Sequence, residues 1–300
     1  MDEPAAGQTP AQVVARASMA SVYQASVWAQ ACLPYRDPGP GKVWYRLNNG
    51  GKLTLTPGED RVDLASLRTG TRTGAVGALP YGVIARKVLI YFATELRRTG
   101  DRAIVLPGSL REFLTDVLGV QYGGRNAALV KEQLRRIEAM SMSLLQEGPD
   151  EGSTTRLYWR VVEAAHSAGA FGLADTNRDS GAATIILDER YAEHVLASSI
   201  PLDQAMLEHL NEAMALDIYL WLTYRRAAGR DVRVSWDDLM LQFGSATTAV
   251  IEFRRLFRKH LVKIQAAWPE LDVETDRRGV TIARGPAHVA QRRRKHLPAA

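Results

Sequence analysis

The spacing of apolar residues predicts a series of helices and strands in the first half of this 300-residue chain. Apolar positions recur at helical spacing from residue 81 to 98, and Thr99-Gly100 is a stop signal. Ser109 is suited to cap a second helix. The predicted elements are helix 81–98, strand 102–106, helix 110–118, helix 126–140 and strands 141–145 and 155–162. This order is that of a winged helix-turn-helix, in which the third helix usually enters the major groove of DNA.

The same order recurs nearer the C-terminus, with Ser235 as a helix cap. The recurring elements are helix 215–226, strand 232–234, helix 236–243, helix 247–268 and strands 271–274 and 280–282. A strand at 183–187 and a helix at 189–197 join the two series. The sequence therefore predicts an α+β fold, mainly α, built from tandem winged-helix (winged helix-turn-helix) domains.

Ahead of the first series, residues 43–47 and 52–56 form a predicted hairpin around the Asn48-Asn49-Gly50-Gly51 turn. Residues 11–33 are an Ala-rich stretch that predicts a helix ended by Pro34. The predicted domains are an N-terminal extension at 1–40, a first winged-helix domain with its leading hairpin at 41–182, a connecting strand and helix with a second winged-helix domain at 183–286, and a basic tail at 287–300.

Positive charge is concentrated at the C-terminal end of the chain. Residues 251–300 hold twelve Lys or Arg against five Asp or Glu, whereas the preceding 250 residues hold twenty-six against twenty-eight. Local positive charge attracts polyanions, of which nucleic acid is the most common. The alternative interpretation, a solvated surface with a disordered basic tail, is the better one for Gln291-Arg292-Arg293-Arg294-Lys295-His296 taken alone.

The predicted helix 247–268 separates an apolar stripe from a basic face. Val250, Phe253, Phe257, Leu261 and Ile264 form the stripe. The basic side chains on the opposite side are Arg254, Arg255, Arg258, Lys259 and Lys263, with Glu252 as the one acid among them. Such a face favours a polyanion partner, because phosphate contacts release condensed counterions. Arg277 and Arg278 in the predicted turn at 276–279 would contact adjacent phosphates. The alternative interpretation of the helix is a solvated surface, because many amphipathic surface helices are basic without binding DNA.

Within this region, the residues nearest the N-terminal end of the third helix are candidates for contact with base edges, and the later lysines are suited to phosphates. The base-edge candidates are Ser245, Thr247, Thr248 and Arg254. The first series offers a weaker counterpart in Arg125, Asn126, Lys131 and Arg135. Because Glu132 and Glu138 dilute its charge, packing or dimerisation is as good an interpretation there as DNA contact.

Signatures of catalysis are missing from the sequence. Gly41-Lys42-Val43 and Gly51-Lys52-Leu53 both fail the phosphate-binding loop pattern, and the six histidines show no metal-binding spacing. Cys32 is the one cysteine, which excludes a zinc finger within the chain. Tyr219, Trp221, Tyr224 and Trp236 have helical spacing, which indicates core packing and not a stacking platform for bases. We expect no catalytic residue, no metal, no cofactor and no enzyme activity.

No apolar run is long enough to cross a bilayer, and the first residues have no positive n-region. We therefore expect a cytoplasmic protein with no membrane partner.

Motifs in both series resemble the plasmid-encoded RepA replication initiators over about residues 79–285. The first group of motifs is Leu79-Pro80-Tyr81-Gly82, Arg86, Thr94-Glu95, Ser109, Phe113, Leu118-Gly119, Gly123-Gly124-Arg125, Gln133 and Arg136. The second group is Leu216-Asp217-Ile218-Tyr219-Leu220-Trp221-Leu222-Thr223-Tyr224, Ser235-Trp236, Gln242-Phe243-Gly244, Phe253, Phe257, Leu261, Trp268-Pro269 and Gly279.

This resemblance implies a bacterial, plasmid-associated initiator of DNA replication. Such a protein would bind repeated duplex DNA sites (iterons) at a plasmid origin and recruit host replication proteins, and a homodimer of it could repress its own gene. A winged-helix transcriptional repressor without an initiation role would use the same fold and the same basic face. A nicking enzyme is a third alternative, but it would need a histidine metal cluster that the sequence lacks.

Overall fold

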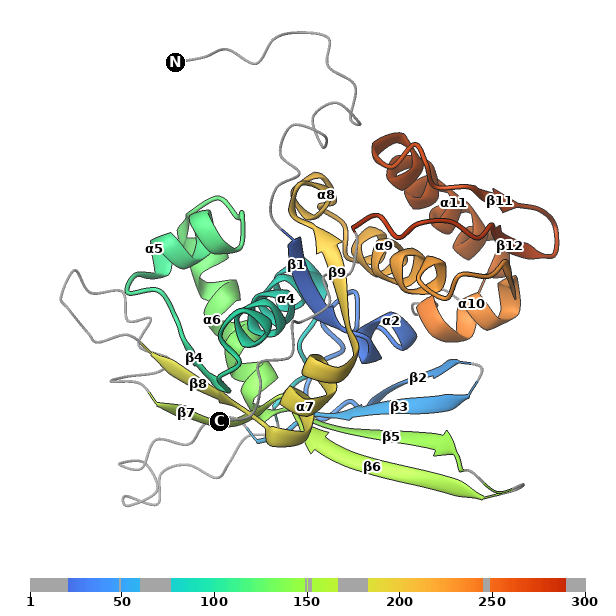
Figure 1. Cartoon of the computed structure of the whole chain (residues 1–300). Coiled ribbons are helices and arrows are strands. Elements are labelled where there is room, and N and C mark those ends of the chain that lie inside the picture. Colours follow the sequence, from blue (N-terminus) through green and yellow to red (C-terminus); the bar gives the residue numbers. More distant parts are fainter. Residues whose placement is uncertain are drawn as a thin grey trace, which may run out of the picture.

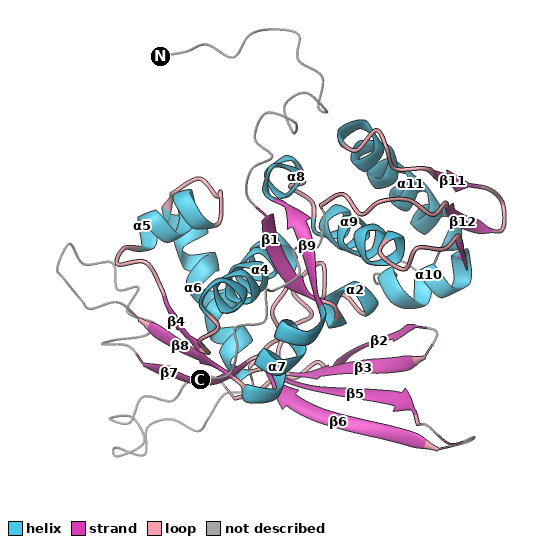
Figure 2. Cartoon of the chain, in the orientation of Figure 1, coloured by secondary structure: helices cyan, strands magenta, loops and turns pink. Residues whose placement is uncertain are grey.

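The computed structural model describes residues 21–289 except 49, 60–76, 149, 151–152, 167–182 and 245–248. Helices and antiparallel strands are mixed throughout this part of the chain (Figures 1 and 2). The predicted basic tail at 287–300 lies outside the described residues from residue 290 onward. The base-edge candidates Ser245, Thr247 and Thr248 lie outside them as well.

The C-terminal series has the predicted order of elements. Its members are α9 (Ala213–Arg226), β10 (Val232–Ser235), α10 (Trp236–Phe243), α11 (Val250–Ala267), β11 (Val273–Thr275) and β12 (Gly279–Ile282). The strands form an antiparallel sheet in the order β10-β12-β11. The predicted cap is confirmed, because the Ser235 hydroxyl accepts a hydrogen bond from the Asp238 N–H at 3.1 Å.

The N-terminal series also keeps the predicted order of elements. Its members are α4 (Gly82–Thr99), β4 (Ala103–Val105), α5 (Leu110–Glu112), the π-helical turn η1 (Phe113–Val117), α6 (Gly124–Ala139), β5 (Ser141–Glu147) and β6 (Thr154–Arg160). Gly100 ends α4 in the left-handed region with a φ of 77°, as its place in the stop signal predicts. Ser109 caps α5 through the Glu112 N–H at 3.1 Å.

Strand pairing in the N-terminal series differs from that of the C-terminal series. Instead of joining the β5–β6 hairpin, β4 pairs with β8 (Thr184–Leu187), which in turn pairs with β7 (Val162–His166). The hairpin instead joins β2 (Trp44–Asn48) and β3 (Gly51–Thr56) in a four-stranded sheet with the order β2-β3-β5-β6. The predicted leading hairpin is therefore confirmed, and the two series differ in sheet arrangement although they share an order of elements.

The prediction of an N-terminal helix at 11–33 is wrong over the part of it that is described. Ser21–Ala25 forms strand β1, which pairs with β9 (Ser199–Asp203), and only α2 (Val27–Gln30) is helical. Alanine favours a helix locally, yet the backbone partner offered by β9 decides the conformation, as tertiary context commonly does. The predicted joining strand and helix are β8 and α7 (Glu189–Ser198), and α8 (Gln204–His209) follows β9.

Helix α4 lies at the centre of the molecule, between β1, α6, α7 and α9 (Figure 1). Its Arg86 donates hydrogen bonds from Nε and Nη2 to the two carboxylate oxygens of Asp217 on α9, each at 2.7 Å. Both side chains are almost fully buried. This paired charge ties the first helix of one series to the first helix of the other.

Candidate nucleic-acid interface

Helix α11 buries four of the five residues of the apolar stripe predicted for it, and the fifth, Val250, is half-buried. Phe253, Phe257, Leu261 and Ile264 are all at most 3% exposed. The ring of Phe257 lies edge-on to Trp221 and Trp236, with centroids 6.1 and 5.7 Å away. Trp221, Tyr219 and Trp236 are buried as well, so their interpretation as core residues is confirmed. The stripe fixes the rotation of the helix and leaves its basic side turned away from the core.

Trp236 is the point at which α11 meets the turn between β11 and β12. Its indole N–H donates to the Asp276 carbonyl at 3.0 Å. Above its ring lie the guanidinium groups of Arg254 and Arg258, at 5.7 and 4.9 Å from the centroid. Arg258 also donates to the Asp276 carbonyl at 3.0 Å and to the Thr275 hydroxyl at 3.3 Å. Arg258 therefore holds the turn against the helix.

The turn between β11 and β12 presents two exposed arginines. The Asp276 carboxylate accepts hydrogen bonds from the N–H groups of Arg278 and Gly279, at 2.7 and 2.9 Å. These bonds lower the pKa of Asp276, and Arg233 on β10 adds an ion pair at 2.5 Å. A side chain at Gly279 would collide with the Val234 carbonyl, which explains the glycine there. The side chains of Arg277 and Arg278 are exposed and have no ion-pair partner among the described residues.

The basic face of α11 is partly neutralised by an acid that its own sequence does not reveal. Glu212, just before α9, lies 3.2 Å from both Lys259 Nζ and His260 Nδ1, and 3.8 Å from Lys263 Nζ. Burial alone would raise the pKa of Glu212, but the bond from Lys259 and the nearby positive charges hold it below its usual value. Glu252 is the one acid among the residues of α11 on this face, as predicted, and Glu212 adds a second carboxylate from outside the helix.

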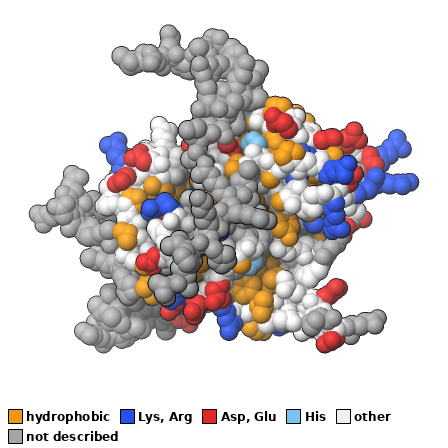
Figure 3. Space-filling model, viewed as in Figure 1, with side chains coloured by type: hydrophobic (Ala, Val, Ile, Leu, Met, Phe, Trp, Pro, Cys, Tyr) orange, Lys and Arg blue, Asp and Glu red, His pale blue; other side chains and the backbone are white. Residues whose placement is uncertain are grey.

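Glu252 itself forms an ion pair within α11. Its carboxylate pairs with Arg255 one helical turn away, at 2.5 Å. Both side chains are exposed, so this ion pair contributes little to stability, and Arg255 can readily exchange Glu252 for a phosphate. We define the basic end of the C-terminal series as Arg254, Arg255, Arg258, Lys259, Lys263, Arg277 and Arg278. Figure 3 shows Lys and Arg side chains gathered over α11 and the β11–β12 turn, with acidic groups among them.

The candidate residues of α6 lie at the other end of the molecule (Figure 1). Arg125 is exposed and Lys131 is half-buried. Arg135 pairs with Glu132, as the dilution of charge predicts, and Glu132 also accepts from Arg136 at 2.7 Å. These residues do not join the basic end of the C-terminal series.

Sequence reasoning missed two charged residues of the site. Arg233 and Glu212 belong to β10 and to the residue before α9, and both meet the site through the fold and not through sequence spacing. The one available signal was the predicted strand at 232–234, which belongs to the same series as the turn at 276–279.

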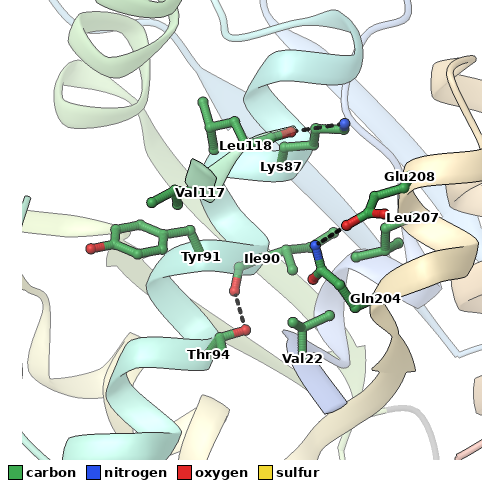
Figure 4. A pocket seen from close by; sticks show the side chains of 10 residues that line it. All are labelled: Val22, Lys87, Ile90, Tyr91, Thr94, Val117, Leu118, Gln204, Leu207 and Glu208. Atoms are coloured by element: carbon green, nitrogen blue, oxygen red, sulfur yellow. Dashed lines mark hydrogen bonds between the residues drawn. The ribbon is translucent and has the colours of Figure 1, made fainter. Parts of the chain in front are cut away.

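A small cavity opens between α4 and α8 (Figure 4). On the α4 side, the Lys87 ammonium donates to the Leu118 carbonyl at 2.9 Å, and on the α8 side Gln204 and Glu208 bond to each other. The cavity measures about 70 Å³, whereas small-molecule pockets occupy about 300–1,000 Å³. It therefore fits no nucleotide. Among the described residues, no helix has the length and apolarity to cross a membrane, and no three potential ligands gather at a metal site.

Comparison with known proteins gives a family and a fold. The family model for plasmid-encoded RepA protein matches residues 79–238. Two crystal structures of RctB domains 2 and 3, one of them a selenomethionine derivative, are similar to the chain at 12% identity. Their TM-scores are 0.52 and 0.50, and the matches cover 87 and 86% of this chain and 98 and 97% of the solved chains. A comparison with curated protein sequences gives no match.

Proposed function

Because the chain belongs to the family of plasmid-encoded RepA proteins, we propose that it initiates plasmid replication by binding repeated duplex DNA sites at the origin. The observation that carries the proposal is the basic end of the C-terminal series, with Arg277 and Arg278 exposed beside α11. The role is one of binding, without catalysis. Host replication proteins are the expected partners of the DNA-bound chain.

We infer that the C-terminal series is a winged helix-turn-helix. Its order of elements and its β10-β12-β11 sheet support this assignment, since the hairpin then lies beside the third helix as a wing. In this arrangement α11 faces the major groove, and the β11–β12 turn reaches the neighbouring backbone.

The cations of the basic end take different parts in the proposed complex. Arg277 and Arg278 contact phosphates directly, because no acid among the described residues pairs with them. Arg258 acts as a positioning residue, since it fixes the turn to the helix through the Asp276 carbonyl. Lys259 and Lys263 exchange Glu212 for phosphate when DNA arrives. Each phosphate neutralised releases counterions, so binding weakens as salt rises.

Selection of bound DNA fragments from the replicon that carries this gene tests the proposal. We expect the purified chain to enrich fragments with adjacent direct repeats. Enrichment of a single inverted repeat would instead support a winged-helix repressor without an initiation role. Recovery of random fragments, with no preference over calf-thymus DNA, would contradict both.

A further inference from the structure

The four-stranded sheet β2-β3-β5-β6 has one face packed and one face open. Residues paired across neighbouring strands share a face, so Tyr45, Thr54, Ser143 and Tyr158 form one row across the sheet. The adjacent row of paired residues lies on the opposite side of the sheet. That opposite row is Trp44, Leu55, Met142 and Trp159.

Exposure distinguishes the two faces. At the centre of the opposite row, Leu55 and Met142 are 1 and 2% exposed, so this side belongs to the core. On the open face, Tyr45 is 54% and Tyr158 is 60% exposed. Each edge strand thus carries an exposed tyrosine on this face. The backbones of the two edge strands lie about 14 Å apart at this row, as three interstrand spacings of about 4.8 Å require.

The open face is also basic. Lys52, Arg156 and Arg160 lie on the same side as the two tyrosines, and none has an ion-pair partner among the described residues. The Lys52 ammonium lies 4.5 Å from the ring centroid of Tyr45. Glu147, at the end of β5, is the one acid on this side of the four strands. The face thus combines aromatic rings and hydroxyl groups with a net charge of +2.

We propose that this open face binds single-stranded nucleic acid, with unpaired bases stacked on Tyr45 and Tyr158 and phosphates held by Lys52, Arg156 and Arg160. Stacking on exposed aromatic rings combined with cations along the backbone is how proteins hold single strands. Duplex DNA cannot use the rings, because its bases are stacked inside the helix. The face is therefore distinct from the duplex-binding surface of the proposed function, and it goes beyond that function.

Fluorescence anisotropy with a labelled oligo(dT) of about 20 nucleotides tests this proposal on the full chain. Tyr45→Thr combined with Tyr158→Thr keeps a strand-favouring residue and should weaken binding at least tenfold, since each base stacked on an aromatic ring contributes substantially. Tyr45→Phe combined with Tyr158→Phe should bind like the wild type. Tyr122→Thr removes an exposed tyrosine outside the sheet and should also leave binding unchanged. An oligo(U) arm tells whether DNA or RNA is preferred.

Two further measurements keep the proposal falsifiable. Duplex DNA binding by the threonine double variant should equal that of the wild type, which separates this site from the duplex-binding surface and reports an intact fold. Photocrosslinking of iododeoxyuridine-substituted oligo(dT) to the wild-type chain should label peptides of β2 and β6. Absence of single-strand binding, crosslinks confined to residues 250–282, or capture of an acidic peptide in place of the oligonucleotide would overturn the proposal.

Discussion

The two series of helices and strands share an order but differ in where their first strand pairs. In the C-terminal series β10 pairs with β12, so the hairpin stays beside the third helix and Arg258 ties its turn to α11. In the N-terminal series β4 pairs with β8 instead, and the β5–β6 hairpin extends a larger sheet. The same order of elements thus exposes a basic turn in one half and an aromatic sheet face in the other.

The third helices of the two series differ in how their charges are used. On α11, Lys259 and Lys263 meet one acid, Glu212, which lies just before α9, and the neighbouring turn adds two exposed arginines. On α6, Arg135 and Arg136 both pair with Glu132. Because exposed pairs exchange readily with solvent and phosphate, charge count alone does not rank the two helices. The two exposed arginines of the turn make the C-terminal series the stronger candidate for duplex DNA binding.

The largest predicted effect concerns the link between the two series. Arg86→Met leaves the Asp217 carboxylate buried without its partner, and burial already raises the pKa of Asp217. We expect a loss of about 3–5 kcal/mol in the free energy of unfolding, measured by urea denaturation. Arg98→Met, at an exposed position of the same helix, should change it by less than about 0.5 kcal/mol. Equal stability of the two variants would show that the series do not depend on this link.

A smaller effect is expected from removing the acid beneath α11. Glu212→Gln keeps the size of the side chain and frees Lys259 and Lys263 for phosphate, while the helix start is spared because Glu212 makes no side-chain cap bond. Duplex DNA affinity should rise about two- to fivefold, in keeping with an exposed ion pair of up to about 1 kcal/mol. A fall in affinity, measured by anisotropy at fixed salt, would contradict the exchange of partners.

The third helix of the N-terminal series, α6, should contribute less to duplex DNA binding than the C-terminal series does. Arg125→Gln combined with Lys131→Gln and Arg135→Gln is expected to weaken duplex binding by less than about twofold and to change the salt slope by less than about one phosphate contact. Titrations at several salt concentrations measure both quantities. A loss larger than that caused by removing Arg277 and Arg278 would reverse the ranking of the two series.

The smallest effect is a pH dependence of stability. Burial lowers the pKa of His194, His260 and His288, so the native state binds fewer protons than the unfolded state near the ordinary histidine pKa of about 6.5. Their contribution is complete above that pH and is lost as the pH falls below it. Thermal unfolding should therefore occur at lower temperature at pH 5.5 than at pH 7.5. His288→Gln, which removes the stack on Trp268, should reduce this difference.

The order of elements followed from the sequence because periodicity, caps and stop signals are local. Ser109, Ser235 and Gly100 take the predicted positions, and Phe253 and Phe257 are buried as their spacing requires. Strand pairing did not follow from the sequence, because the paired strands are far apart along the chain. β4 pairs with β8 about 80 residues away, and β1 pairs with β9 at a still larger separation. Such pairings are decided by packing and not by local pattern.

The candidate site was predicted in part for the same reason. The cations of α11 and its neighbouring turn share one end of the molecule, as helical spacing and the predicted hairpin imply. Glu212 reaches that end only through the packing of α9 against α11, so a helical wheel of α11 could not include it. Arg86 and Asp217 belong to the motifs of the family resemblance, yet they form a buried structural pair and not part of a binding surface.

The salt dependence of duplex DNA binding tests the central claim most directly. In Arg277→Ala combined with Arg278→Ala, the slope of log affinity against log salt should fall by about 1.8, since each phosphate contact contributes about 0.9. Affinity at low salt should drop about tenfold or more. Arg292→Ala combined with Arg293→Ala, in the basic tail, serves as the matched control and should change the slope less. A turn variant that binds with the wild-type affinity and the wild-type slope would contradict the account.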